Sequence, residues 1–259
     1  MENQAKKKFE YHKKKFGIED SEELRKFEKL LELTEFDKLE CSVKLEDGKI
    51  NANRFHLICW NKPDKDFVKI FYAIREFLQI KGINTEIITN MMPKLDLDRT
   101  EKIGVGIDLR EKREESRAKI WFKIKDWPGK VEDIIIKYTK TKLEHLSDKK
   151  SLLFGIDFGF DGKNSVKTYV KFNEKAAKKH LSRETLELSG LSEEILVTQK
   201  DDEYIINFFT KERSKIAEKT GNKYLIQLNE QIDYQDGGFI TLSEREIKQG
   251  EVRNATIYY

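Results

Sequence analysis

The sequence predicts a mixed α/β fold of the α+β type, in which ten antiparallel strands form a barrel around a polar interior and helices ring the outside. Two observations predict it: period-two alternation recurs in five paired segments, and most of the segments between them have helical periodicity. A twisted sheet of ten strands tends to close on itself. Because amphipathic helices cover the apolar face of such a sheet, the polar face turns inward.

The clearest pair of strands covers residues 103–126, and each arm alternates between two faces. One face is apolar and carries Ile103, Val105, Ile107, Leu109, Ala118, Ile120, Phe122 and Ile124. The other face carries glycines, charges and a tryptophan: Gly104, Gly106, Asp108, Arg110, Lys119, Trp121, Lys123 and Lys125. This pair alone would suit a half-solvated sheet, but closure of the ten strands places the charged face inside the barrel.

The remaining elements follow from the same two periods. Further strand pairs are expected at residues 39–60, 152–172, 195–209 and 238–259. Helices are expected at residues 64–80, 128–143, 173–189 and 210–220, whereas residues 83–97 fit either a helix or a strand. The lysine-rich N-terminus, with Lys6–Lys8 and Lys13–Lys15, is expected to form a solvated, partly helical cap. Because nothing resembles a Gly/Ser linker, residues 1–259 are expected to form one domain.

The composition argues against several functions. Charged residues make up 37% of the chain, but lysines and glutamates are interspersed and the net charge is +3, which disfavours a nucleic-acid binder. No apolar run approaches the ~18 residues of a membrane span, and no apolar segment follows the N-terminal lysines, so we expect neither a membrane helix nor a signal peptide. The two cysteines fit a reduced, cytoplasmic protein, and with four histidines they indicate no metal site.

Several short motifs, in one order along nearly the whole chain, resemble a known family. The more specific ones are G-I-D-L-R at residues 106–110 and K-D-W-P at residues 125–128. Supporting motifs are residues 40–54, Ser116-x-x-Lys119, G-I-D-F at residues 155–158, Asp161-Gly-Lys163, Tyr169 and Tyr258-Tyr259. Together they resemble the cyanobactin-type peptide prenyltransferases, the LynF/TruF/PatF family.

This resemblance implies the ABBA prenyltransferase fold, a ten-stranded antiparallel barrel ringed by helices with its chemistry in the interior. It implies transfer of an isoprenyl group, dimethylallyl or geranyl, from an isoprenyl diphosphate to a ribosomally made, modified and often cyclic peptide. The diphosphate would be the co-substrate. Any Mg²⁺ would be carried by the diphosphate, because the chain has no DDxxD-like aspartate cluster. We expect a monomer.

Such a reaction needs cations for the leaving diphosphate, a surface that screens the allylic cation, and a base for the acceptor's proton. The resemblance implies that Glu40 is the catalytic base and that Arg54 binds the diphosphate. A three-residue loop at residues 46–48 would place Glu40 opposite Arg54, whereas a loop of two or four residues would place Glu40 opposite Phe55. An ordinary cross-strand ion pair is the alternative interpretation.

The rest of the expected diphosphate-binding set is Lys119, Lys123, Tyr169 and Lys167. Lys119 and Tyr169 match family positions, Lys123 replaces an arginine, and Lys167 stands in place of an acidic residue. Lysines that extend from a barrel rim into solvent are the alternative. Asp108 and Arg110 are expected to orient each other on the inward face.

The expected prenyl and acceptor pocket consists of Trp121, Leu196, Val197 and Tyr258. Trp121 shares a face with the lysines, and Tyr258 points inward if its apolar neighbour Ile257 packs outward. Residues 196 and 197 stand where family members differ with donor length, which leaves the donor length open. The acceptor atom and the choice between forward and reverse prenylation also stay open.

Two other functions fit the same residues. One is a catalytically silent, peptide-binding relative, which the presence of Glu40 and the basic residues disfavours. The other is a prenyltransferase that acts on small aromatic molecules, which differs from the first interpretation only in the acceptor.

Overall fold

The structure is a computed structural model that describes residues 4–33, 36–63, 65–125, 151–172, 174–200, 203–232 and 238–259. The helix expected at residues 128–143 lies outside these ranges, as does most of the K-D-W-P motif.

The described strands are joined in a closed order. They are β1 Lys38–Glu46, β2 Lys49–Asn51, β3 Arg54–Trp60, β4 Thr100–Asp108, β5 Arg117–Lys125, β6 Ser151–Gly159, β7 Asn164–Val170, β8 Glu194–Lys200, β9 Glu203–Thr210, β10 Gly238–Ser243 and β11 Asn254–Tyr258. Hydrogen bonds join them in the order β11-β10-β9-β8-β7-β6-β5-β4-β3-β1-β2, and β11 also pairs with β1. Every pair whose register is described runs antiparallel.

β2 and β3 are two parts of one strand. The second half of β1 pairs with β2 and the first half pairs with β3, and the interruption lies at Ala52 and Asn53. When β2 and β3 are counted as one strand, ten antiparallel strands follow one another in the closed order of a barrel, with helices around them. The predicted fold class is therefore confirmed.

The contacts of the chain divide it into two compact units. The first consists of residues 1–41, 53–143 and 149–167, and the second of residues 42–52, 144–148 and 168–259. The first unit thus contains β3 to β6 with the starts of β1 and β7, and the second contains β2 and β8 to β11 with the ends of β1 and β7. The single domain expected from the sequence stays a prediction.

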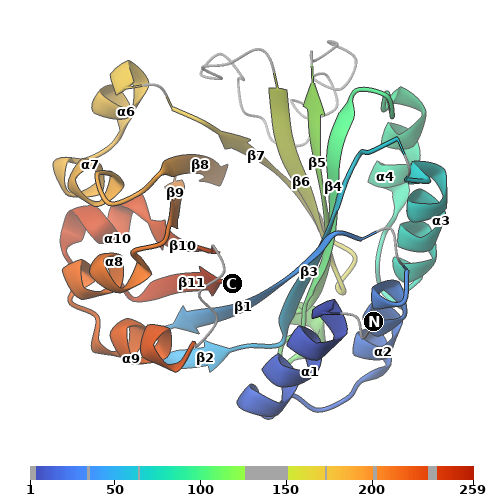
Figure 1. Cartoon of the computed structure of the whole chain (residues 1–259), viewed down its shortest axis with the longest axis horizontal. Coiled ribbons are helices and arrows are strands. Elements are labelled where there is room, and N and C mark those ends of the chain that lie inside the picture. The colour runs from blue at the N-terminus through green and yellow to red at the C-terminus, as the bar shows by residue number, and fades with distance from the viewer. Residues whose placement is uncertain are drawn as a thin grey trace. The chain divides into compact units, whose positions relative to one another are not determined.

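Aromatic side chains form the core of the first unit. Its helices are α1 Gln4–Phe16, α2 Glu22–Leu31, α3 Phe67–Phe77, α4 Glu86–Met91 and the 3₁₀ turns η1 Met92–Lys94 and η2 Arg113–Glu115. The helices lie along one face of β3 to β6 (Figure 1). The ring centroid of Phe27 in α2 is 5.9 Å from that of Phe55 in β3, and Phe71 in α3 stacks on Phe122 in β5 at 6.0 Å. The apolar face of the sheet is buried by these contacts, which leaves the alternate face polar.

The second unit is built on the same principle. Its helices are α6 Glu174–His180, α7 Arg183–Ser189, α8 Arg213–Thr220, α9 Lys223–Gln231 and α10 Glu244–Gln249. α10 packs on β9 and β10, and α8 packs on α9. The buried residues Ile206, Phe208, Ile240 and Ile257 share the helix-covered face, because their strands pair Phe208 with Ile240 and Ile240 with Ile257.

Several helices agree with the sequence pattern, but α9 and α10 are not predicted by it. α3 begins after Asp66, whose side chain accepts a hydrogen bond from the backbone N–H of Lys69 at 2.9 Å, and α8 ends at Gly221 with φ 67°. Residues 174–189 form two helices, and residues 86–94 are helical. α10 is not predicted, because residues 238–259 alternate as a strand pair. Ser243 begins it by accepting from the N–H of Glu246 at 3.3 Å.

The lysine-rich N-terminal segment also packs on the sheet, so the predicted cap is only partly solvated. It is helical, as expected, but Phe9 and His12 are fully buried. The ring of Phe9 lies 4.7 Å from that of Phe55, and the ring of His12 lies 5.1 Å from it. The spacing of three residues places Phe9 and His12 on one face of α1, and of the lysines in this helix only Lys8 is buried as well.

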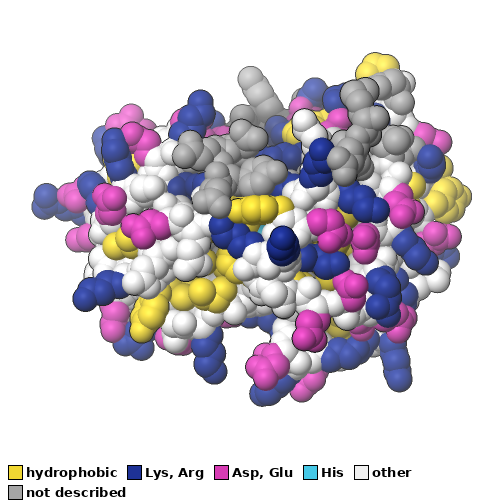
Figure 2. Space-filling model, turned by 60° about the horizontal axis from the view of Figure 1, so that its bottom comes forward, with side chains coloured by type: hydrophobic (Ala, Val, Ile, Leu, Met, Phe, Trp, Pro, Cys, Tyr) yellow, Lys and Arg dark blue, Asp and Glu magenta, His cyan; other side chains and the backbone are white. Residues whose placement is uncertain are grey.

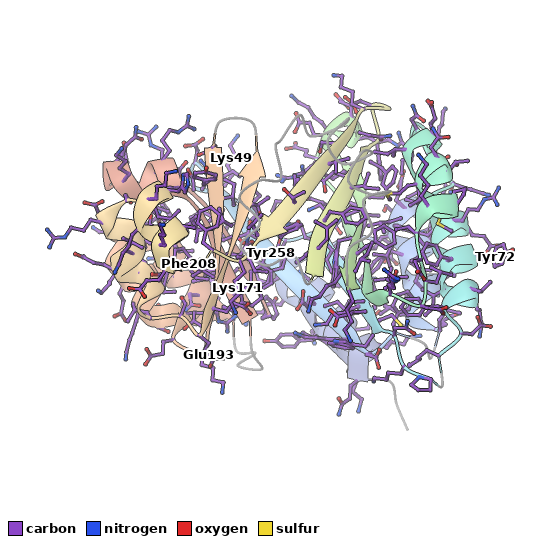
Figure 3. All side chains as sticks on the ribbon, turned by 90° about the horizontal axis from the view of Figure 1, so that it is seen from above. Lys49, Tyr72, Lys171, Glu193, Phe208 and Tyr258 are labelled. Carbon is purple, nitrogen blue, oxygen red and sulfur yellow. The ribbon has the colours of Figure 1, made fainter. Side chains whose placement is uncertain are left out.

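Charges of both signs share the surface. Figure 2 shows Lys and Arg side chains interspersed with Asp and Glu on the face that it displays. Tyr72, which is 63% exposed, extends from the outer surface of α3 (Figure 3).

None of the helices in the described part of the chain is long and apolar enough to cross a membrane.

The packing of α1 can be tested with a substitution at Phe9. Phe9→Ala removes a buried ring and is expected to lower the free energy of unfolding by about 3–5 kcal/mol, measured by urea denaturation. Glu10→Ala, at an exposed neighbouring position, serves as the control and is expected to change stability little. Equal effects in the two variants would mean that α1 does not depend on its contact with β3.

Candidate functional site

The polar face of the first unit is organised in rows that run across the strands, because antiparallel pairing sets opposite residues side by side on one face. The first row contains Arg54, Asp108, Arg117 and Gly159. The second row contains Glu40, His56, Gly106, Lys119 and Asp157. The third row contains Lys38, Ile58, Gly104, Trp121 and Gly155. The fourth row contains Trp60, Lys102, Lys123 and Leu153.

The carboxylate of Asp108 is the centre of a charged network. Its side chain is 1% exposed, and its Oδ2 lies 2.9 Å from Nη1 of Arg54, 3.1 Å from Nε of Arg117 and 3.4 Å from Nζ of Lys119. Its Oδ1 accepts from Nε of Arg110 at 3.0 Å. The predicted contact between Asp108 and Arg110 is therefore confirmed, and three more cations share the same carboxylate.

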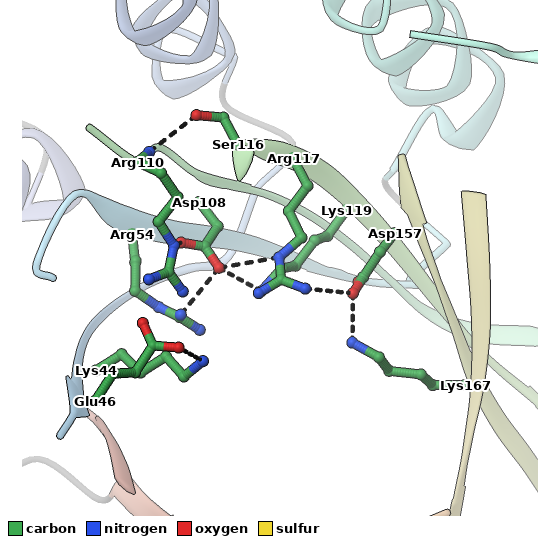
Figure 4. A network of polar contacts seen from close by, with 10 residues as sticks. All are labelled: Lys44, Glu46, Arg54, Asp108, Arg110, Ser116, Arg117, Lys119, Asp157 and Lys167. Carbon is green, nitrogen blue, oxygen red and sulfur yellow. Dashed lines mark hydrogen bonds and ion pairs between the residues drawn. The ribbon is translucent and has the colours of Figure 1, made fainter. Parts of the chain in front are cut away.

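Asp157 extends this network along β6. Its Oδ2 lies 3.3 Å from Nη1 of Arg117 and also pairs with Nζ of Lys167. Arg117 therefore bridges the two carboxylates (Figure 4). We call the following set the cationic cluster: Arg54, Asp108, Arg110, Arg117, Lys119, Asp157 and Lys167. It joins five basic side chains to two carboxylates, so positive charge is in excess.

The two carboxylates stay ionised in this setting. Burial favours the neutral form of Asp108, but the surrounding cations, led by Arg54, outweigh it and hold the pKa of this carboxyl well below its usual range. The same balance lowers the pKa of Asp157, where burial is outweighed by the cations, of which Lys167 contributes most.

The charged form of Lys119 is disfavoured within the cluster. Burial is the largest influence and lowers the pKa of its ammonium well below the usual range, and the neighbouring Arg54 lowers it further. Asp108 offsets only part of this effect. An anion placed beside Lys119 would favour its charged form, which is a property expected of an anion-binding site.

Glu40 and Arg54 do not face each other, so the expected register is wrong. Asp47 and Gly48 both have positive φ, 47° and 80°, and form a two-residue turn between the paired residues 46 and 49. The interruption at residues 52–53 then shifts the pairing by one more residue, which places Glu40 opposite His56. Arg54 pairs with Asp108, and Glu40 pairs with Nζ of Lys38 at 2.9 Å.

Trp121 and Lys123 lie on the polar face, as the alternation predicts. Nζ of Lys123 is 2.8 Å from Oε2 of Glu101, and Nζ of Lys125 is 3.1 Å from Oε1 of the same carboxylate. Glu101 lies at an irregularity in β4, where the pairing with β5 shifts between Thr100 and Lys102. Lys123 is therefore held by Glu101 in the fourth row, and its role in diphosphate binding stays a prediction.

His56 is not among the residues that the sequence pattern predicts. A Cβ atom on Gly106 would lie 1.9 Å from Cδ2 of His56, so the imidazole occupies the space above Gly106. Burial, followed by the charges of Lys119 and Arg54, lowers the pKa of His56 to about 3. The ring is therefore neutral at physiological pH. Glycine within a strand marks the close approach of another group, and this is the signal that could have revealed His56.

The candidate pocket residues of the second unit lie on two faces. Leu196 is opposite Asn207, and Tyr169 is opposite Thr198, which places both on the polar face of this unit. Val197 is opposite Ile206 on the helix-covered face and is 1% exposed. The prediction that both residues 196 and 197 line a pocket is wrong for Val197, because adjacent residues of a strand point in opposite directions.

Tyr258 belongs to an aromatic row on the polar face of the second unit. Its ring centroid is 4.1 Å from that of Phe239, and the ring of Phe239 is 4.6 Å from that of Phe209. Ile257 is fully buried on the opposite face, as expected. Phe209 and Phe239 were not predicted, because only the pairing of β9, β10 and β11 brings the three rings into line.

The described side chains favour an anion over a metal ion on this face. In these ranges no group of three or more His, Cys, Asp or Glu residues is placed to hold a metal. Arginine and lysine bind phosphate oxygens well, since a guanidinium donates paired hydrogen bonds and an ammonium supplies a compact charge. The cationic cluster could therefore bind a phosphate-bearing ligand and stabilise negative charge that develops on a leaving phosphate.

Comparison with known families matches residues 3–259 to the Family of unknown function (DUF5838). The chain belongs to this family. No curated protein matches it.

Two solved structures with a similar fold are 6-dimethylallyltryptophan synthases. One is the crystal structure of 6-dimethylallyltryptophan synthase from Micromonospora olivasterospora in complex with DMASPP and Trp, which has 13% sequence identity and a TM-score of 0.54. The match covers 85% of this chain and 80% of that chain. A second, a 6-dimethylallyl tryptophan synthase, has 13% identity and a TM-score of 0.55 over 85% of this chain and 79% of that chain. These similarities show a shared ABBA-type fold, and the peptide-specific family stays a prediction.

The central place of Asp108 can be tested by removing its charge. Asp108→Asn keeps the shape of the side chain but leaves four cations without their shared carboxylate, and is expected to lower the free energy of unfolding by about 3–5 kcal/mol. Because the pKa of Asp108 is lowered on folding, its contribution is present above the ordinary value of 3.8 and is lost as the pH falls below it. The difference from the wild type should therefore shrink in acid.

Chemical denaturation at several pH values measures this effect. Asp98→Asn, at an exposed aspartate of the first unit, is the matched control and should leave the midpoint unchanged. If Asp108→Asn were as stable as the wild type at neutral pH, Asp108 would not be what balances the cationic cluster.

Proposed function

We propose that this protein transfers an isoprenyl group from an isoprenyl diphosphate to a residue of a ribosomally made peptide. The donor is dimethylallyl or geranyl diphosphate. The acceptor class follows from the motifs shared with the cyanobactin-type peptide prenyltransferases, above all G-I-D-L-R at residues 106–110.

The observation that carries the proposal is the cationic cluster. Its five basic side chains exceed its two carboxylates, and burial makes the excess charge unfavourable until an anion arrives. A diphosphate supplies the missing negative charge. A similarly folded synthase in complex with DMASPP supports the same assignment.

In the proposed reaction, the bond between C1 of the isoprenyl group and the diphosphate oxygen breaks, and the electron pair leaves with the diphosphate. Arg54, Lys119 and Lys167 stabilise the charge that builds on the diphosphate oxygens. The acceptor atom forms a bond to the allylic cation and releases its proton to Glu40. The products are free diphosphate and the prenylated acceptor.

The position of Glu40 supports its proposed role as the base. It lies in the second row with Lys119, three strand spacings away, which separates the two backbones by about 14 Å. The imidazole of His56 lies between them, so the donor and the acceptor would bind above this ring. The Glu40 side chain is held by Lys38 at 2.9 Å and keeps 16% of its surface exposed.

Further roles rest on the motif resemblance. Lys123 and Tyr169 are proposed as additional diphosphate contacts, and Trp121, Leu196 and Tyr258 as walls around the isoprenyl group and acceptor. Mg²⁺ would accompany the diphosphate with its own water ligands, because Asp108 and Asp157 are already held by cations.

We also propose that the protein acts as a monomer in a reducing compartment such as the cytoplasm. Cys41 and Cys59 are both buried and form no disulfide, which suits a reducing environment.

A small aromatic acceptor is the second candidate. The similar synthase was crystallised in complex with Trp as well as DMASPP, which favours an aromatic amino acid as an alternative to a peptide. A catalytically silent, peptide-binding relative is a third, and would bind peptide without responding to an isoprenyl diphosphate.

Transfer can be measured directly by mass spectrometry. The protein is incubated with dimethylallyl or geranyl diphosphate and with either a panel of peptides or free tryptophan, and a gain of one isoprenyl mass on a peptide is expected. Glu40→Gln should lower kcat at least about a hundredfold, the usual contribution of a general base, and change donor affinity less than twofold.

Glu111→Gln, at an exposed glutamate of the first unit, is the control and should retain full activity. Transfer to tryptophan but not to peptides would select the second candidate. No transfer to any acceptor would exclude the proposed activity, and an unchanged rate in Glu40→Gln would remove Glu40 from the mechanism.

A further inference from the structure

The third row is an apolar strip between charged rows. Apart from Lys38 at its end, its side chains are those of Ile58 and Trp121, and its other two positions are glycines. The second row, with Lys119 and Asp157, borders the strip on one side.

The fourth row borders the strip on the other side and carries charges at its two central positions, Lys102 and Lys123, between Trp60 and Leu153. Nζ of Lys102 lies 5.4 Å from the centre of the Trp60 ring, and Lys123 is paired with Glu101 at 2.8 Å. Adjacent rows are two residues apart along a strand, about 6.6 Å. On β4 and β5, the strands that carry Gly104 and Trp121, the apolar surface next to the cationic cluster is therefore only one row deep.

Gly104 determines where the indole of Trp121 lies. A Cβ atom on Gly104 would lie 2.0 Å from both Cε2 and Nε1 of Trp121, which no packed side chain tolerates. The indole therefore occupies the space above the backbone of β4 that a side chain at residue 104 would fill. Gly106 and His56 repeat this arrangement one row away, with a ring that is neutral.

We propose that Gly104 and Trp121 together limit the length of the isoprenyl group that the site accepts. The inference rests on the proposed function, because it assumes a diphosphate bound at the cationic cluster. A short isoprenyl group would cover the indole and end there. A longer one would extend over Lys102 and Lys123 and remove their charges from water, which is unfavourable.

Substitutions of Trp121 and of Gly104 should change the space available to the isoprenyl group in opposite directions. Trp121→Ala opens the space above Gly104, where the additional carbons of a longer chain can be buried. Gly104→Ala instead displaces the indole into the space where the isoprenyl group lies. In the double variant the Cβ atom at residue 104 meets no indole, so its effect should disappear.

The experiment is a calorimetric titration with three probes that need no acceptor: inorganic pyrophosphate, dimethylallyl S-thiolodiphosphate and geranyl S-thiolodiphosphate. The wild type should bind the dimethylallyl probe at least about tenfold more tightly than the geranyl probe, although the geranyl probe has the larger apolar surface. Trp121→Ala should reduce this ratio at least about tenfold. Gly104→Ala should weaken both isoprenyl probes at least about tenfold, and the double variant should match Trp121→Ala. Affinity for pyrophosphate should stay within about twofold throughout.

Gly190→Ala is the control for a glycine substitution, since Gly190 ends α7 with φ −62° and a Cβ atom there would meet its nearest neighbour at 3.4 Å. It should leave all three affinities unchanged. Circular dichroism confirms that each variant is folded, and Trp121→Ala keeps the test decisive if Gly104→Ala fails to fold. An equal dimethylallyl-to-geranyl ratio in the wild type and in folded Trp121→Ala overturns the inference. If the wild type binds none of the three probes, the proposed function fails instead.

Discussion

One buried carboxylate, that of Asp108, holds the polar face of the first unit together. It contacts Arg54 of the preceding strand, Arg117 and Lys119 of the following strand, and Arg110 of its own segment, at 2.9 to 3.4 Å. Removing the carboxylate would leave these cations to repel one another in a buried setting. A single carboxylate therefore permits a concentration of positive charge that the fold could not otherwise tolerate.

The same arrangement leaves the charge incompletely balanced. Asp157 neutralises part of what remains, through Arg117 and Lys167, but the ammonium of Lys119 still has a lowered pKa. Functional sites often hold groups in states that burial disfavours, because a ligand then supplies the compensating interaction. The cationic cluster fits this description, with a diphosphate as the ligand.

The aromatic core and the site are two faces of the same strands. Phe122 packs against Phe71 of α3, and its neighbours Trp121 and Lys123 consequently point to the polar face. A strand with bulky apolar residues at every second position thus fixes the direction of the charged residues between them. This is why the alternation of β5 alone predicts that Lys119 and Trp121 share a face.

Other features depend on information that a strand pattern does not contain. The relation of Glu40 to Arg54 depends on the two-residue turn at Asp47 and Gly48 and on the interruption at residues 52–53, each of which shifts the register by one residue. His56 stands in an apolar run and acquires its place only because Gly106, on another strand, has no side chain.

The sequence pattern predicts well which face of the sheet a side chain occupies, and it predicts poorly which residue lies opposite that side chain. Both outcomes have one physical reason. Alternation is local, whereas the partner of a residue depends on the turn and on the neighbouring strand. α1 is hard to predict for a different reason: its lysines suggest exposure to solvent, but Phe9, His12 and even Lys8 are buried.

Calorimetric titration of inorganic pyrophosphate into the wild type and into Lys119→Met tests most directly whether the cationic cluster is a diphosphate site. The account predicts saturable binding to one site in the wild type and affinity at least about tenfold weaker in the variant. It also predicts that the variant without ligand melts at no lower temperature than the wild type, because the lost charge is one that burial disfavours. Absence of saturable binding to the wild type, or equal affinity in the two proteins, would contradict it.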